Sequence, residues 1–107
     1  MSLPTPETEV VSTTQYLVAS DDELARPYRV IIENDDVTPM DFVTLVLCAI
    51  FELTIERAVD VMLTAHTSGR ALVAVYPYEE ARDRVYRAHD AAREAGYPLS
   101  FYLEPDA

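Results

Sequence analysis

The chain has 107 residues, half of them apolar, and carries 19 acidic residues against 8 basic ones, for a formal net charge of −11. This length suits a single domain. The acidic balance disfavours nucleic acids and anionic membranes, which need clusters of Lys and Arg, and it favours cationic partners.

Residues 1–25 differ in composition from the rest of the chain. They contain five acidic residues, no basic residue, two prolines and many Ser and Thr. We therefore expect a flexible acidic N-terminal extension, although residues 10–20 (VVSTTQYLVAS) could instead add an edge strand. The extension lacks the basic region and apolar core of a secretory signal, and no stretch approaches the roughly 18 apolar residues of a membrane span. We expect a cytoplasmic protein.

The globular pattern begins at residue 26 and continues to residue 107. Residues 28–33 (YRVIIE) are β-branched and predict a strand. Thr38 is a good N-cap and Pro39 suits the first helical position, which predicts a helix directly behind the strand. A second helix is predicted between a cap at Thr54 and a stop at Gly69. Both predicted helices have apolar residues at helical spacing, namely Val43, Val46, Leu47 and Ile50 in the first and Ala58, Val61, Met62 and Ala65 in the second.

The C-terminal third predicts a strand, a helix and a strand. Residues 72–76 are continuously apolar, which indicates a strand buried on both faces. Pro77 is expected to begin a third helix that ends at Gly96, and the alternation in residues 99–104 predicts a half-buried strand. The order β-α-α-β-α-β predicts an α+β fold with two layers, a three-stranded sheet packed by three helices.

The stretch Asn34-Asp35-Asp36 directly follows the first predicted strand. A metal ion would need more oxygen ligands than these residues supply, and no spaced D-x-D motif is present. Asn and Asp at this place commonly satisfy the amides of a turn and favour the start of a helix. Since capping needs only one of the three side chains, the stretch has spare polar groups that could bind a ligand.

Histidine and cysteine give few further candidates. His66 lies four residues after Met62, so both project from one helical face, where a histidine is most often a core or rim residue bonded to backbone. As a catalytic base it would need a nucleophile, and the chain has no G-x-S-x-G motif. We expect His89 at the surface and Cys48 as a small apolar residue of the core.

Two motifs together resemble a known family. N-D-D-x-T-P-M-x-F-V at 34–43 and A-x-x-x-M-L-x-x-H-x-x-G at 58–69 are similar to the ClpS adaptors of the bacterial N-degron pathway, and the resemblance extends over 27–104. It implies a fold like the C-terminal domain of the ribosomal stalk protein. It also implies a monomeric adaptor, not an enzyme and without cofactor, that binds proteins with a free N-terminal Leu, Phe, Tyr or Trp. Such proteins would be passed to a ClpA-type AAA+ unfoldase for degradation by ClpP.

The resemblance also implies roles for individual residues. Asn34, Asp35 and His66 would bind the α-amino group. The hydrophobic pocket would be lined by Ile32, Asp36, Thr38, Met40, Val43, Met62, Ala65 and Leu99. Glu79 and Arg84 would contact the N-terminal domain of the unfoldase, which the extension would also engage.

Two positions carry expectations about selectivity. Met40 would act as a gate against β-branched first residues. Ala65 is smaller than the valine of the family pattern, so the pocket floor is expected to be wider.

Two other interpretations remain open. One is a docking module of the stalk type without an amino-acid pocket, and the other is a small hydrolase or metal enzyme that uses Asp35, Asp36 and His66.

Overall fold

The computed structural model describes residues 21–106, so the expected flexibility of residues 1–20 and the alternative strand over 10–20 lie outside the described part. The described elements are α2 (Asp21–Leu24), β1 (Pro27–Glu33), α3 (Met40–Ala49), α4 (Ile55–Ser68), β2 (Arg70–Pro77), α5 (Tyr78–Ala95) and β3 (Ser100–Pro105). From β1 onward this order confirms the predicted β-α-α-β-α-β arrangement. The short helix α2 lies in the segment that we expected to belong to the extension.

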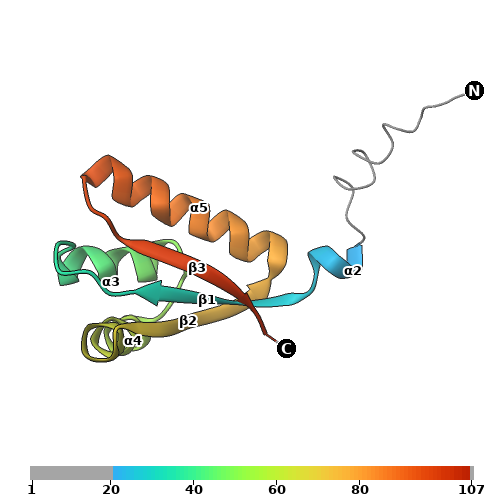
Figure 1. Cartoon of the computed structure of the whole chain (residues 1–107), viewed down its shortest axis with the longest axis horizontal. Coiled ribbons are helices and arrows are strands. Elements are labelled where there is room, and N and C mark those ends of the chain that lie inside the picture. Colours follow the sequence, from blue (N-terminus) through green and yellow to red (C-terminus); the bar gives the residue numbers. More distant parts are fainter. Residues whose placement is uncertain (1–20, 107) are drawn as a thin grey trace, which may run out of the picture.

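The sheet has the strand order β2-β1-β3, and both pairings are antiparallel. In Figure 1, β1 runs between β2 and β3, and α3 and α4 lie at the end of β1 away from α2. Val30 and Ile32 of β1 belong to one core cluster with Phe101 of β3 and with apolar residues of α3, α4 and α5. The three long helices therefore share one core with the sheet, as the two-layer prediction required.

The prediction that β2 is buried on both faces is wrong. Ala71 and Val73 are buried, but Leu72 and Val75 are 41% and 42% exposed. β2 is an edge strand of a sheet that is covered on one face, so its side chains divide between core and solvent. A register shift in its pairing with β1 interrupts the alternation, which leaves both Leu72 and Val75 facing solvent. A run of apolar residues does not by itself distinguish this position from a central strand.

The predicted helix starts are displaced by one residue. Pro39 and Pro77 are the N-cap residues, with extended backbone angles, and the helices begin at Met40 and Tyr78. Thr38 is therefore not the N-cap. Its hydroxyl donates a hydrogen bond to Asp35 Oδ2 at 2.9 Å, so the side chain serves the preceding turn.

The boundaries of α4 are confirmed. The hydroxyl of Thr54 accepts the N–H of Arg57 at 3.1 Å, and Gly69 ends the helix with a φ of 91°. Gly96 ends α5 in the same left-handed conformation, which glycine adopts at low cost. Among the helices of residues 21–106, none is long and apolar enough to cross a membrane.

Candidate functional site

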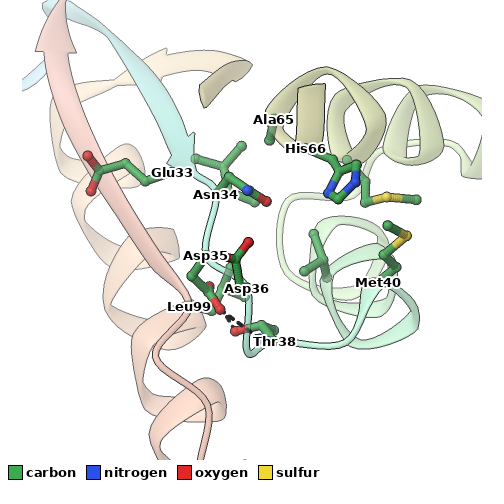
Figure 2. Close-up of a pocket in the computed structure, with 12 residues that line it drawn as sticks. Glu33, Asn34, Asp35, Asp36, Thr38, Met40, Ala65, His66 and Leu99 are labelled. Atoms are coloured by element: carbon green, nitrogen blue, oxygen red, sulfur yellow. Dashed lines mark hydrogen bonds between the residues drawn. The ribbon is translucent and has the colours of Figure 1, made fainter. Parts of the chain in front are cut away.

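A pocket of about 140 Å³ opens at the end of β1, between the start of α3, the C-terminal half of α4 and the segment that precedes β3 (Figure 2). Its lining contains every residue that the sequence analysis assigned to the amino-group site or to the hydrophobic pocket. Glu33 lines the pocket as well and was missed, although its side chain points away from the cavity in Figure 2. The available signal was its position directly before Asn34, which extends the polar stretch to E-N-D-D.

The inner wall of this pocket is apolar. Ile32, Val43, Ala65 and Leu99 are buried, and they come from four different parts of the fold. Met40 is 46% exposed and stands at the rim. A bulky apolar group that enters the pocket would therefore be removed from water on several sides.

Asp35 is the residue of the polar stretch that holds the turn. Its Oδ1 accepts the N–H groups of Val37 at 2.9 Å and Thr38 at 2.6 Å, and its Oδ2 accepts the Thr38 hydroxyl. Partial burial raises the pKa of this carboxyl, but the three hydrogen bonds outweigh burial and the net pKa is lowered. Asp35 is thus ionised at neutral pH, and its Oδ2 keeps room for one further donor.

Asn34 is positioned by its backbone. Its N–H donates to the carbonyl of Gly69 at 3.0 Å, which joins the end of β1 to the end of α4. His66 lies one turn before Gly69 on α4, so this bond holds the amide and the imidazole on adjacent elements. In Figure 2, Asn34, Asp36 and His66 border the same open space.

The rim is rich in hydrogen-bond acceptors that have no partner among the described residues. In the described part of the chain, the Asn34 amide, the Asp36 carboxylate and the His66 imidazole are exposed and make no side-chain hydrogen bond. Residues 21–106 also contain no cluster of three or more His, Cys, Asp and Glu that could hold a metal ion. Chemically, the site combines an apolar cavity with acceptors at its mouth, which suits an apolar ligand that carries a cationic group of donors.

The two residues expected to dock the unfoldase lie in different environments on α5. Glu79 has a side chain that is 57% exposed, whereas the side chain of Arg84 is 12% exposed. Arg84 donates to the carbonyl of Ile50 and to Glu80 Oε2, and its guanidinium lies 4.7 Å from the ring centroid of Tyr76. Arg84 therefore holds parts of the fold together, whatever else it contacts.

The expectation that His89 lies at the surface is wrong. The side chain is half-buried between α5 and β3, and its Nε2 accepts the N–H of Phe101 at 2.9 Å. Burial, with a smaller contribution from Arg93, lowers the pKa of the imidazole. The spacing of four residues from Val85, which packs against the core, was the signal that could have placed His89 on the inner side of the helix. Cys48 is half-buried and packs against the core.

Fold and pocket together define a small α+β binding domain with an apolar cavity and a polar rim. The family described as ATP-dependent Clp protease adaptor protein ClpS matches residues 23–102. The chain belongs to this family and is by class an adaptor of the Clp protease.

Relatives and a solved structure agree with this assignment. The chain is 45% identical over 84 residues to ATP-dependent Clp protease adapter protein ClpS 1 of Bradyrhizobium diazoefficiens, covering 78% of this chain and 83% of the relative. It is 39% identical over 98 residues to ClpS 2 of Mesorhizobium japonicum, covering 92% and 97% of the two chains. The structure of Agrobacterium tumefaciens ClpS2 bound to L-phenylalaninamide matches 77% of this chain and 99% of that chain, with 41% identity and a TM-score of 0.73.

Proposed function

We propose that this adaptor binds the free N-terminal Leu, Phe, Tyr or Trp of substrate proteins and delivers them to a ClpA-type AAA+ unfoldase for degradation by ClpP. The observation that carries the proposal is the pocket itself, an apolar cavity whose mouth is lined by exposed acceptors. The relative from Agrobacterium tumefaciens, bound to L-phenylalaninamide, supports it. That ligand presents a free α-amino group next to an aromatic side chain, as an N-terminal Phe does.

The polar rim suits the α-amino group. An ammonium has three donors, and the rim offers the carbonyl of Asn34, the carboxylates and an unprotonated nitrogen of His66. Asp35 already accepts three hydrogen bonds, so in this proposal it supplies negative charge and one remaining acceptor position. Asp36 makes no such bonds within the described residues and would share the pairing with the ammonium.

The apolar wall suits one large side chain. Burying such a side chain contributes roughly 1.5–3 kcal/mol, and a hydrogen bond to a charged group adds about 1.5–3 kcal/mol. After the cost of association, these contributions correspond to a dissociation constant of roughly micromolar or somewhat lower. Met40 at the rim would disfavour β-branched first residues by crowding their second γ substituent.

Delivery would use a surface away from the pocket. Glu79 at the exposed start of α5 is the accessible member of the pair that we assigned to the unfoldase. The N-terminal extension would provide a second contact, and the adaptor would act in the cytoplasm as a monomer.

Fluorescence anisotropy with peptides that differ only in their first residue tests the proposal. Leu, Phe, Tyr and Trp should bind with micromolar or lower dissociation constants, whereas Val, Ile, Ala and Glu should bind at least about tenfold more weakly. A stalk-type docking module would show no such preference. A hydrolase or metal enzyme would instead reveal turnover in an activity screen or bound metal in elemental analysis.

A further inference from the structure

The wall of the pocket depends on where β3 begins. Leu99 is 5% exposed, lines the pocket, and immediately precedes Ser100, the first residue of β3. Only residues 96–99 separate the end of α5 from β3. A small displacement of this strand start would therefore move Leu99 relative to Ile32 and Ala65 across the cavity.

Two sets of contacts fix the start of β3. On one side Ser100 and Phe101 pair with Glu33 and Ile32 of β1. On the other side the N–H of Phe101 donates to Nε2 of His89 on α5 at 2.9 Å. The two rings also pack together, with centroids 6.0 Å apart. His89 thus joins the helix layer to the strand two residues beyond Leu99.

We propose that His89 is a positioning residue of the pocket: its unprotonated Nε2 accepts the N–H of Phe101 and thereby sets the place of Leu99 in the pocket wall. The imidazole does not line the cavity and acts only through β3. This inference rests on the proposed binding of N-terminal residues.

The hydrogen bond requires the neutral imidazole. Protonation converts Nε2 from an acceptor to a donor, which would then oppose the N–H of Phe101. Burial first and Arg93 second lower the pKa of His89, so the bond is intact at neutral pH. Between the unfolded pKa of about 6.5 and the lower folded pKa, the unfolded chain binds more protons, so this contribution is lost as the pH falls.

The charged side chains near His89 are either paired with each other or face away from the contact with Phe101. His89 is therefore the group whose titration changes this contact. On α5, Arg93 is paired with Asp90 at 3.1 Å.

On β3, Tyr102 and Glu104 alternate with Phe101 and therefore point to the opposite face of the sheet. There they contact two arginines, since Arg70 donates to the Tyr102 hydroxyl and Arg29 pairs with Glu104. On β1, Glu33 and Arg29 alternate with Ile32, the partner of Phe101, and face the same way as these side chains.

Two substitutions separate the hydrogen bond from the charge. In His89→Gln the amide oxygen can accept the N–H of Phe101 but cannot titrate, whereas His89→Leu keeps the bulk and removes the acceptor. At pH 7.5 we expect H89Q to bind an N-terminal Phe peptide within about twofold of the wild type, and H89L to bind about three- to tenfold more weakly. Equal affinities of H89L and wild type would overturn the proposal.

The dependence of peptide affinity on pH distinguishes this role from a merely structural one, which would not change that dependence. Wild type and H89Q both keep His66, so any effect of His66 is common to them. As the pH is lowered from 7.5 to the point at which His89 becomes protonated, which lies below the ordinary imidazole pKa, the wild type should lose affinity more steeply than H89Q. Identical profiles would also overturn the proposal.

Hydrogen exchange at the Phe101 amide, followed by NMR without any peptide, separates this inference from the proposed function. The amide should be protected in wild type and H89Q and should exchange faster in H89L, and faster in wild type as the pH is lowered after correction for intrinsic rates. If the wild type bound no N-terminal peptide, the proposed function would fail. Protection that is unchanged in H89L would refute the role of His89, whatever the binding result.

Discussion

At the scale of single residues, the polar stretch after β1 divides into a turn and a binding edge. Asp35 accepts three hydrogen bonds from Val37 and Thr38 and so forms the turn. Asn34 and Asp36 remain exposed at the pocket mouth. Substitutions at the two aspartates should therefore have different consequences.

Asp36→Asn is expected to lower the affinity for an N-terminal Phe peptide by about tenfold, because a charge-assisted contact to the ammonium becomes a neutral one. The free energy of unfolding should stay within about 0.5 kcal/mol of the wild type, since Asp36 is exposed. Asp35→Asn should lower both quantities. Anisotropy and urea unfolding on the same samples check this, and a loss of stability in D36N equal to that in D35N would contradict it.

Ala65 determines how much room the pocket floor offers. Its side chain is buried at the pocket wall, so Ala65→Val adds bulk that the surrounding core cannot easily displace. We expect A65V to weaken the binding of Trp and Tyr peptides by about fivefold or more while Leu is affected less. The ranking of Leu, Phe, Tyr and Trp peptides measures this effect, and an unchanged ranking would refute it.

At the scale of elements, the connection between α3 and α4 is held by α5 and β2. Arg84 reaches the carbonyl of Ile50 at the end of α3 and lies over the ring of Tyr76. The hydroxyl of Tyr76 donates to the carbonyl of Phe51 at 2.9 Å. Glu52 follows in a left-handed conformation with φ of 60°, which these contacts help to maintain.

Arg84→Ala is accordingly expected to lower the free energy of unfolding by about 1–3 kcal/mol, through the lost hydrogen bonds to Ile50 and Glu80 and the lost contact with Tyr76. Peptide affinity should change less than twofold, because Arg84 is not part of the pocket. Urea unfolding measures the first effect. Glu79→Gln is the matched surface variant: because the side chain is exposed, it should lower the free energy of unfolding by less than about 1 kcal/mol but weaken binding to the unfoldase. Equal destabilisation by both variants would contradict this division.

Sequence patterns predicted the order of the elements, and the resemblance to the ClpS family supplied the residues that line the pocket. Several details that depend on tertiary contacts were not predicted. Helical spacing and the caps at Thr54 and Gly69 located α4 because these signals are local. The exposure of Leu72 depends on which strand occupies the sheet edge, and the burial of His89 depends on where β3 packs. The neighbouring residues do not encode the exposure of Leu72, and the spacing of His89 from Val85 indicates only which side of α5 it occupies. Likewise, the sequence does not distinguish the roles of Asn34, Asp35 and Asp36, whereas the hydrogen bonds of Asp35 in the structure do.

At the scale of the whole molecule, the net charge of −11 favours the approach of a cationic chain end. Association with a peptide that has a free N-terminus should therefore become slower as salt is added. Between 50 and 500 mM NaCl we expect the association rate to fall about three- to tenfold, while the dissociation rate changes less, because long-range charges act mainly on the encounter. Stopped-flow fluorescence measures both rates, and an association rate independent of salt would contradict a role for the field.

The central claim is that the pocket mouth binds a free α-amino group. A comparison of one N-terminal Phe peptide in free and acetylated form, by anisotropy at pH 7.5, tests it most directly. Acetylation removes the charge and two of the three donors and leaves the rim acceptors without a cationic partner, so we expect the affinity to fall by at least about a hundredfold. Equal affinities for the two peptides would contradict the account.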